Sequence, residues 1–538
     1  MNKTILIVLI VYISVCAFCQ VPLQEIARFN CSPDYDFIYH IKANGDINGD
    51  GHPDLIYATA NYTIAATIGA QISIYHSIPD STDTPEFTIN APNSNFGSFG
   101  SAISYSGDIN GDGIDDLVVG SKDYGIYSSG AVLIYYGSSN LSGQPDVVLY
   151  GTDYYSFDTF WLFFGSYILT DFDLNGDGYN DLIISGGGPQ DYWFGHIWAF
   201  LGGPQFDAEC DFYVGGTVTN ENLGYGLGIG DINGDGFDDI VYKRKTNIVN
   251  YEQYQYVLDI HLGGTVINNI PSHEYQLFSS NQGNISNILA DGDMNGDGYD
   301  DISFILYTSS GPRLKVIYGG INLASLTITD YDLPPYVMKN LLFYCNMNDD
   351  GYADFCIQNY AMQQGGPEYG NFLVYEQTSS NLDLSYDFIY TGEDLNSGYG
   401  LGYYLGDMNQ DGYPEFIVFS NEYSLSLFNN YATILTEQYV SITDDVIPYL
   451  AEKIKIYPNP FRDNITIALT GIQDKSEAEI SVYDIKGRRL YHKKGIDSDN
   501  FTLVPIVHFD SDLNNGIYVL SIRFDDTMVY STKIIHFK

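Results

Sequence analysis

The residues of this chain with the clearest chemical potential are aspartates and asparagines that recur in a nonapeptide. The string DINGDGHPD begins at Asp46, and six close variants follow it along the chain. In a tight loop the side chains at positions 1, 3 and 5 point toward one centre, and glycine at position 6 permits the reversal because it takes positive φ. Position 7 adds a main-chain carbonyl, and position 9 adds a last carboxylate. Such oxygen atoms suit Ca²⁺, a hard cation that takes about six to eight oxygen ligands.

The seven nonapeptides predict about seven structural calcium ions, one per loop. Asn346 replaces the first carboxylate of the sixth motif, and Glu415 replaces the last aspartate of the seventh, so both loops are expected to bind more weakly. The predicted ligands, loop by loop, are Asp46, Asn48, Asp50, His52 and Asp54; Asp108, Asn110, Asp112, Ile114 and Asp116; Asp173, Asn175, Asp177, Tyr179 and Asp181; Asp231, Asn233, Asp235, Phe237 and Asp239; Asp293, Asn295, Asp297, Tyr299 and Asp301; Asn346, Asn348, Asp350, Tyr352 and Asp354; and Asp407, Asn409, Asp411, Tyr413 and Glu415.

Other proteins use similar strings in different settings. An EF-hand needs glutamate at position 12, where the first three motifs here have Tyr57, Val119 and Ile184. Dockerin loops and thrombospondin-type calcium repeats follow one another more closely than these motifs, whose starting points lie 53 to 65 residues apart. A single string of this kind also occurs as a turn without metal. Seven strings in phase favour metal loops.

The regular spacing also predicts the fold, because a fixed period of this size indicates a repeat architecture. An apolar or glycine-rich segment precedes each motif, and a β-rich run follows it, such as DLVVG at Asp116. A polar turn and another strand come next, as in GAVLIYYG at Gly130. Three or four short strands per repeat suit one blade of a propeller. We therefore predict an all-β chain, a seven-bladed β-propeller followed by a small antiparallel β-sandwich. A solenoid of stacked repeats is the alternative.

Two resemblances sharpen this prediction. Residues 30–436 resemble the FG-GAP repeats of integrin α chains and bacterial surface proteins, best in FGSFG, DINGDGIDD and GAVLIYYG between Phe96 and Gly137. The resemblance implies an integrin-α-like calcium-binding propeller. After Glu452, the strings IKIYPNPFRDNITI, ISVYDIKGRRLY and NGIYVLSI resemble the C-terminal sorting domain of the type IX secretion system. That resemblance implies delivery across the outer membrane, then removal of the domain or anchoring. An ordinary binding sandwich is the alternative.

The domain prediction follows from these segments. Residues 1–19 are predicted to be a signal peptide, with an apolar core from Ile5 to Val15 and cleavage after Cys19. A membrane anchor or a lipoprotein cysteine is the alternative. Residues 20–436 form the predicted propeller, 437–451 a linker and 452–538 the sorting sandwich. The chain is expected outside the cell or on the outer surface of a Gram-negative bacterium. There Cys345 and Cys356 form either a disulfide or two free thiols.

Charge and motifs limit the partners. The net charge of −46 comes wholly from residues 1–451, and such a surface repels nucleic acid. No segment after the signal is apolar enough to span a membrane. The expected partners are the type IX machinery, through residues 452–538, and an unidentified extracellular glycan or protein. No H-E-x-x-H, G-x-S-x-G or P-loop string is present, so no catalytic residue is predicted.

Adhesion or ligand binding is therefore the predicted function. A propeller-fold polysaccharide lyase or hydrolase and a display scaffold without a ligand are the alternatives. If the calcium loops join the first two strands of each blade, the turns between the second and third strands lie on the opposite face. These turns are predicted to carry a ligand face of aromatic and basic side chains, with plain solvated turns as the alternative. The residues are Tyr124, Tyr192, Trp193, Lys243, Arg244 and Lys245. Residues 23–29 are predicted to pair with the last blade, which otherwise leaves an open edge.

Overall fold

A computed structural model describes most of residues 21–436 and the strands between 454 and 536. In the first stretch it leaves out residues 23, 31–36, 61–69, 77–83, 126, 155–161, 188–193, 218, 225, 251–252, 280–283, 286–287, 309, 334–341, 346, 348–349, 361–369, 378–379, 381, 383–387, 392–396, 409–413 and 425–426. In the second stretch it describes 454–457, 466–469, 477–484, 489–497, 516–524 and 528–536. The predicted signal peptide lies outside these residues. The chain divides into two compact units, Met1–Glu437 and Gln438–Lys538.

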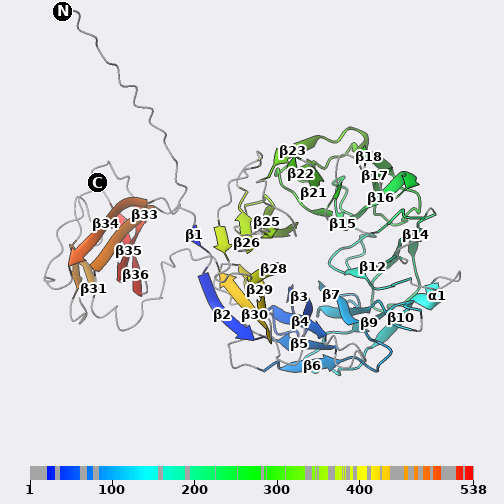
Figure 1. The fold of residues 1–538 in the computed structure, drawn as a ribbon, viewed down its shortest axis with the longest axis horizontal. Coiled ribbons are helices and arrows are strands. Elements are labelled where there is room, and N and C mark those ends of the chain that lie inside the picture. Colours follow the sequence, from blue (N-terminus) through cyan, green and yellow to red (C-terminus); the bar gives the residue numbers. More distant parts are fainter. Residues whose placement is uncertain are drawn as a thin grey trace, which may run out of the picture. The chain divides into compact units, whose positions relative to one another are not determined.

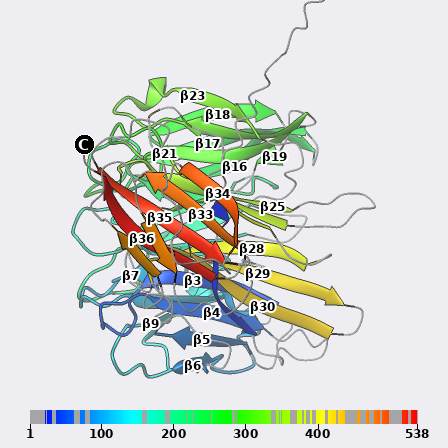
Figure 2. The same cartoon turned by 90° about the vertical axis from the view of Figure 1, so that its left-hand side faces the viewer.

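The described residues are almost wholly β, as predicted. Helix is limited there to α1 (Gly151–Tyr154) and the 3₁₀ turn η2 (Leu323–Ser325). The first unit holds seven sheets in its described part, each built mainly from strands that follow one another along the chain, and their pairings are antiparallel except for that of β1 with β27. Figure 1 labels most of these strands, and Figure 2 shows the four strands of the first sheet side by side.

We number the sheets in the order of the nonapeptides. Their strands are, in the first sheet, β3 (Phe37–Gly45), β4 (Asp54–Ala60), β5 (Gln71–Tyr75) and β6 (Phe87–Asn90); in the second, β7 (Phe99–Gly107), β8 (Asp116–Ser121), β9 (Ala131–Tyr135) and β10 (Val147–Tyr150); in the third, β11 (Tyr167–Leu169), β12 (Leu182–Gly186), β13 (His196–Phe200) and β14 (Phe212–Gly215); and in the fourth, β15 (Leu227–Gly230), β16 (Asp239–Asn250), β17 (Gln253–His261) and β18 (His273–Ser279).

Of the other three sheets of this unit, the fifth and sixth contain five strands each and the seventh contains four. They are, in the fifth sheet, β19 (Asn284–Ile285), β20 (Leu289–Gly292), β21 (Asp301–Thr308), β22 (Gly311–Ile317) and β23 (Ile328–Asp332); in the sixth, β24 (Leu342–Cys345), β25 (Asp354–Tyr360), β26 (Gly370–Tyr375), β27 (Phe388–Thr391) and β1 (Val21–Pro22); and in the seventh, β28 (Ser397–Gly406), β29 (Glu415–Ser424), β30 (Leu427–Thr436) and β2 (Gln24–Asn30).

The cores of the first unit lie between successive sheets. The residues of β8 and β9 are all buried, as expected for strands covered on both faces, whereas β23 alternates between exposed and partly buried residues. Each apolar cluster joins one sheet to the next. One contains Ile72 of the first sheet with Leu133 of the second, and another contains Leu314 of the fifth with Phe355 of the sixth. The sheets therefore stack by their apolar faces.

The N-terminal strand completes the last sheet, as predicted for residues 23–29. Strand β2 pairs antiparallel with β30, from Gln24 opposite Thr436 to Asn30 opposite Tyr431. Strand β28 of the seventh sheet also contacts β3 of the first (Figure 1). The start and end of the first unit are thus joined by main-chain pairing.

The second unit holds two described sheets. One is a pair, β31 (Ile454–Tyr457) with β32 (Thr466–Leu469). The other has the order β34 (Arg489–Asp497), β33 (Glu477–Asp484), β35 (Gly516–Phe524) and β36 (Met528–His536), and all its pairings are antiparallel. These strands contain the alternating segments that the sequence predicts for a small β domain.

Candidate metal-loop array

The nonapeptides occupy the same place in all seven sheets. In six of the sheets the motif begins directly after one strand, and its position 9 opens the next strand. In the third sheet three residues separate the end of β11 from the motif, which begins at Asp173, and β12 begins at Leu182, directly after position 9. In the first sheet β3 ends at Gly45, the loop begins at Asp46 and β4 begins at Asp54. The condition set for the ligand-face prediction, that these loops join the first two strands, is therefore met. The sixth and seventh loops are described only in part. Asn346, Asn348, Asn409, Asp411 and Tyr413 lie outside the described residues.

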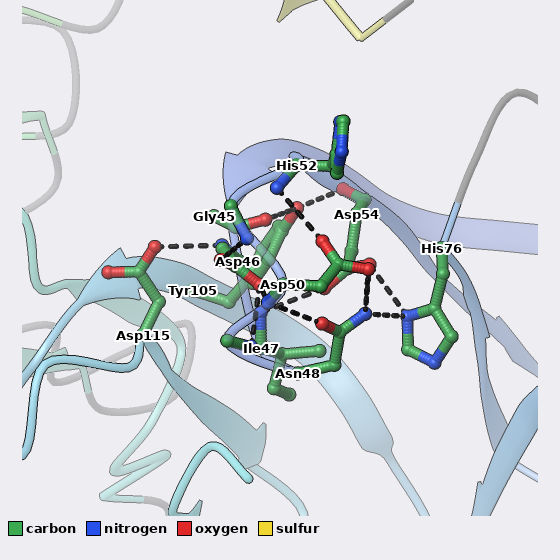
Figure 3. Close-up of polar contacts among 12 residues, drawn as sticks. Gly45, Asp46, Ile47, Asn48, Asp50, His52, Asp54, His76, Tyr105 and Asp115 are labelled. Atoms are coloured by element: carbon green, nitrogen blue, oxygen red, sulfur yellow. Dashed lines mark hydrogen bonds and ion pairs between the residues drawn. The ribbon is translucent and has the colours of Figure 1, made fainter. Parts of the chain in front are cut away.

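The carboxylate at position 1 folds back onto the main chain of its own loop. Asp46 Oδ1 accepts hydrogen bonds from the amides of Gly49 at 2.7 Å and Asp50 at 3.1 Å, and Oδ2 accepts one from Gly51 at 2.6 Å (Figure 3). Asp108, Asp173, Asp231 and Asp293 make the same three contacts in the next four loops. The aspartate therefore fixes the turn that presents positions 3 and 5.

Positions 3 and 5 continue the same pattern. In the first loop Asn48 Oδ1 accepts from the Asp50 amide at 2.8 Å, and Asp50 Oδ1 accepts from the His52 amide at 2.9 Å. The second of these contacts recurs in the second to sixth loops. Oxygen atoms at positions 1, 3 and 5 thus lie along one short, largely exposed turn.

The carboxylate at position 9 is the buried anchor of each loop. It is fully buried in all seven sheets, and it accepts the amide of position 2 at 2.7 to 3.1 Å. Its second oxygen accepts an amide just after the third strand, such as Gly137 to Asp116 at 2.9 Å. Equivalent bonds reach Asp181, Asp239, Asp301 and Asp354. Position 9 therefore ties the loop to two strands of its sheet.

Burial also changes the acidity of this anchor. Loss of solvation raises the pKa of Asp116, Asp181, Asp239, Asp301 and Asp354 to about 7, although main-chain amides partly oppose the shift. Desolvation likewise raises the pKa of Asp54 to about 6, against the opposing effect of His76. Near neutral pH these carboxyls are therefore poised between the charged and the protonated form, and a bound cation would favour the charged form.

Adjacent loops are joined by position 8, which the sequence prediction left without a role. The main-chain amide of Asp115 donates to the Asp46 carbonyl at 3.2 Å, and the Asp115 carboxylate accepts the Asp46 amide at 2.8 Å. Asn180, Asp238 and Asp300 make the same double contact with Asp108, Asp173 and Asp231. The sixth loop has Ala353 here, and only its amide bonds to Asp293, at 2.7 Å. The first six loops thus form a linked series.

Position 7 also links the loops, through its side chain. A Cβ added to Gly111 would lie 2.2 Å from the Tyr179 ring of the next loop. Phe237, Tyr299 and Tyr352 cover Gly176, Gly234 and Gly296 in the same way, and Ile114 covers Gly49. Glycine at position 4 of the first five loops therefore has two causes, a positive φ and this close approach, whereas the sixth and seventh motifs have Asp349 and Gln410 there. The aromatic residues common at position 7 were a signal for this contact that the sequence prediction did not use.

The first loop differs from the others by a histidine beside its anchor. His76 Nδ1 lies 2.6 Å from Asp54 Oδ1 and 2.8 Å from Asn48 Nδ2 (Figure 3). The second and fifth sheets have a tyrosine at the equivalent place after the third strand, Tyr136 and Tyr318. The His52 side chain is exposed, so only its main-chain carbonyl belongs to the predicted ligand set.

The donor chemistry of the loops fits a hard cation. Every side chain at positions 1, 3, 5 and 9 offers a carboxylate or amide oxygen, the ligand atoms that Ca²⁺ prefers. Among the described residues, no three or more His, Cys, Asp and Glu side chains gather at metal-binding distances. The predicted calcium shell stays a prediction.

The predicted ligand face is only partly covered by described residues. Tyr192 and Trp193 lie outside them. Tyr124 lies between β8 and β9 as predicted, but it is half-buried against Phe96 and Tyr150, with ring centroids 4.5 and 5.2 Å away. Its contacts are those of a packed aromatic residue.

The prediction that Lys243, Arg244 and Lys245 lie in the turn between the second and third strands of their sheet is wrong. Strand β16 runs on to Asn250 and β17 begins at Gln253, because the basic residues pair across the sheet with Leu258, Val257 and Tyr256.

The three basic side chains of β16 also have partners within the fold. Arg244 lies 2.5 Å from Asp259 and 3.1 Å from Glu274, and the partly buried Lys243 donates to the Ile285 carbonyl at 3.3 Å. Lys245 lies 4.3 Å from the centre of the Tyr254 ring. Binding of a ligand by these residues stays a prediction.

The Cys356 side chain is buried, and the side chain of Cys345 lies outside the described part of the structure. The choice between a disulfide and two thiols at this pair therefore stays a prediction. Across the described part of the chain, no helix has both the length and the apolar character needed to span a membrane.

Comparison with known proteins identifies both modules. Residues 46–119 match the FG-GAP-like repeat, and residues 455–536 match the secretion system C-terminal sorting domain. The chain is also similar to the ulvan lyase NLR42 of Nonlabens ulvanivorans, with 30% identity over 84 residues. That similarity covers 15% of this chain and 14% of the lyase, so the chain spans a small part of its relative. The sorting domain indicates handling by the type IX secretion system and attachment at the cell surface.

Proposed function

We propose that this chain, which carries an FG-GAP-like repeat and a type IX sorting domain, is a calcium-stabilised, seven-bladed β-propeller that binds an extracellular glycan or protein at the cell surface. The linked series of loops is the observation that carries the proposal. The same nonapeptide lies between the same strands of seven sheets, and neighbouring loops share hydrogen bonds. Pairing of β2 with β30 supports a closed ring of blades, because it gives the last sheet a strand from the start of the chain.

Calcium has a definite task in this proposal. Positions 1, 3, 5 and 9 and the carbonyl of position 7 supply its oxygen ligands in each loop. The buried carboxylates at position 9, whose pKa is raised by desolvation, would be held in the charged form by the cation. Because the metal binds only the folded loops, it stabilises the fold by mass action, by about 2.7 kcal/mol per site at a hundredfold excess over Kd.

The test of the calcium role is thermal unfolding of the full chain with and without metal. Protein stripped with EDTA and dialysed free of the chelator is melted with added Ca²⁺, with added Mg²⁺ and with neither. We expect a rise in Tm with Ca²⁺ that is larger than the rise with Mg²⁺, because Mg²⁺ demands stricter geometry and gives up its water less readily. A Tm that does not respond to Ca²⁺ would refute the structural role.

The test of the binding role is a screen of the same chain, kept in calcium, on arrays of glycans and extracellular matrix proteins. Binding that is retained after removal of residues 452–538 places the activity in the first unit. Absence of any ligand on both arrays contradicts the proposal and leaves a display scaffold.

A second function, polysaccharide cleavage, is favoured by the similarity to the ulvan lyase. A lyase would break the glycosidic bond by elimination and leave an unsaturated sugar that absorbs in the ultraviolet. Incubation with ulvan, followed by absorbance and by a reducing-sugar assay, separates the two functions. Binding without new reducing ends supports the adhesion function, whereas a rise in both signals supports the lyase.

A further inference from the structure

A shallow cleft opens beside the fifth loop, with a volume of about 440 Å³. This volume falls in the range of about 300–1,000 Å³ that is usual for small-molecule sites. The cleft collects side chains from the loop itself, from the end of β22, from β23 and from the segment after β26. The lining residues are Asn295, Asp297, Tyr318, Thr329, Tyr331 and Ser380. All six side chains carry a hydrogen-bonding oxygen or nitrogen, and two of them are aromatic.

The two tyrosines form a pair that the preceding sheets lack. The hydroxyls of Tyr318 and Tyr331 lie 2.8 Å apart. Tyr331 stands opposite Leu314 in the register of β22 and β23. The equivalent position of the first three sheets holds an aliphatic side chain, and the fourth sheet has a tyrosine there but Leu262 in place of Tyr318. These aliphatic residues are Ile89, Leu149 and Val214. The fifth sheet thus builds a polar cleft where the first three sheets place an aliphatic side chain.

The hydrogen-bonding capacity of the cleft suits hydroxyl groups. One tyrosine of the pair donates to the other, so the second keeps a free donor, and Thr329 adds a hydroxyl. Asn295 brings an amide, whereas the Asp297 carboxylate only accepts. Burial and the partner hydroxyl raise the pKa of Tyr318, so its proton is retained. Sugar hydroxyls, which both donate and accept, match such a mixture, and a tyrosine ring offers an apolar face to the sugar carbons.

The charge of the cleft selects among sugars. No lysine or arginine lines it. The nearby cations Arg313 and Lys315 are bound to Asp332 and Asp330, and these aspartates alternate along β23 with Thr329 and Tyr331. Successive residues of a strand point to opposite faces, so the cations lie on the other face of the sheet. Asp297 is a proposed calcium ligand, so in the metal-bound chain its carboxylate is directed to the ion, and no basic side chain lines the cleft to pair with a uronate or sulfate group.

We propose that this cleft binds a neutral saccharide unit, with Tyr331 and Tyr318 as its recognition pair. The inference rests on the proposed function of the first unit as an extracellular binding module and names its site and ligand class. The loop residues Asn295 and Asp297 link the site to the metal array, since they are also positions 3 and 5 of the fifth loop.

The experiment uses the full chain in calcium with four probes: cellotetraose, mannotetraose, xylotetraose and tetragalacturonate. Binding is measured by titration calorimetry for the native chain and for Tyr331→Phe, Ser380→Trp and Tyr136→Phe. Ser380 is exposed, so tryptophan there fills the cleft without disturbing a core. Tyr136→Phe is the matched control, because Tyr136 holds the place of Tyr318 in the second sheet, away from the cleft.

The expected result is binding of at least one neutral tetrasaccharide. Tyr331→Phe should weaken it roughly three- to tenfold, the effect of one lost hydrogen bond. Ser380→Trp should abolish it, and Tyr136→Phe should leave it unchanged. If Tyr331→Phe and Ser380→Trp both bind the neutral tetrasaccharide as well as the native chain does, the cleft is not the binding site, but the proposed function remains. Binding of tetragalacturonate alone, or of none of the four probes, also overturns the assignment. Failure of the glycan and matrix-protein arrays as well would remove the proposed function with it.

Discussion

Removal of one buried anchor should destabilise the first unit far more than removal of an exposed aspartate. Asp116 is fully buried and accepts the amides of Ile109 at 2.9 Å, Asn110 at 3.3 Å and Gly137 at 2.9 Å. Asp116→Ala leaves the amides of Ile109 and Gly137 buried without this acceptor, at about 1–3 kcal/mol each. Part of that cost is offset, because the alanine variant has no carboxylate that must lose its hydration when the chain folds. We therefore expect a loss of about 3 kcal/mol in the free energy of unfolding.

Two further variants separate hydrogen bonding from charge. Asp116→Asn keeps one oxygen acceptor and removes the charge, so in EDTA it should cost about half as much as alanine. In calcium its deficit should grow, because one proposed metal ligand has lost its charge. Asp146→Ala is the control. Asp146 is an exposed carboxylate of the same sheet that accepts the Tyr136 amide at 2.8 Å, and its loss should cost less than about 1 kcal/mol.

The assay is urea unfolding followed by tryptophan fluorescence. All three tryptophans, Trp161, Trp193 and Trp198, belong to the first unit, so the signal reports that unit alone. Measurements at pH 8 keep the anchor carboxyls mostly ionised. If Asp116→Ala falls within 0.5 kcal/mol of Asp146→Ala (about the error of such comparisons), the anchor role of position 9 is wrong.

Three more predictions follow from other parts of the structure. In urea unfolding, Gly111→Ala should destabilise the first unit more than Gly113→Ala. Both residues have positive φ, 73° and 90°, but only at Gly111 would the new Cβ meet the Tyr179 ring. Equal losses of stability would contradict the contact between the two loops. Burial lowers the pKa of His196 from 6.5 to about 4, so the unfolded chain gains this proton first as the pH falls, and His196 alone should subtract up to about 3 kcal/mol of stability between pH 6.5 and pH 4. The buried anchor carboxyls, whose pKa is raised, contribute with the opposite sign over the same range, so the measurement is the difference in pH slope between variants. The slope of His196→Gln should differ from that of the native chain by this amount, His273→Gln should keep the native slope, and an unchanged slope in His196→Gln would rule out this group. Deletion of residues 452–538 should leave the tryptophan unfolding curve intact while the chain stays in the periplasm, and normal surface display of the truncated chain would show that the sorting domain is dispensable.

The sequence predicted the features that depend on periodicity. Seven strings in phase indicated seven β units, and the loops do lie between the first and second strands of seven sheets. The pairing of residues 23–29 was predictable because an open edge strand is costly. The sorting domain was predictable because its turns and strands combine into a specific set of strings, which the family comparison confirms.

The features that the prediction missed depend on contacts between repeats. Position 8 is Asp, Asn, Ala or Pro in the seven motifs. No single residue type therefore marks its hydrogen bonding to the preceding loop. The length of β16 was wrong because Lys243, Arg244 and Lys245 look like a solvated turn. Their partners, which include Asp259 and Glu274, lie on neighbouring strands. The sequence around the three basic residues does not indicate these contacts.

The hydrogen bonds between neighbouring loops explain how so acidic a motif can be repeated in adjacent sheets. Asp115 bonds the first loop and Asp238 the third, and desolvation raises the pKa of both carboxyls. A cation in one loop would lower the free-energy cost of ionising the buried position 9 carboxyl of that loop. It would do the same for the position 8 carboxyl of the next repeat, which is hydrogen-bonded to this loop. Each bound ion would then stabilise two sheets, its own and the next. Three junctions carry a position 8 carboxylate that can act in this way, those formed by Asp115, Asp238 and Asp300.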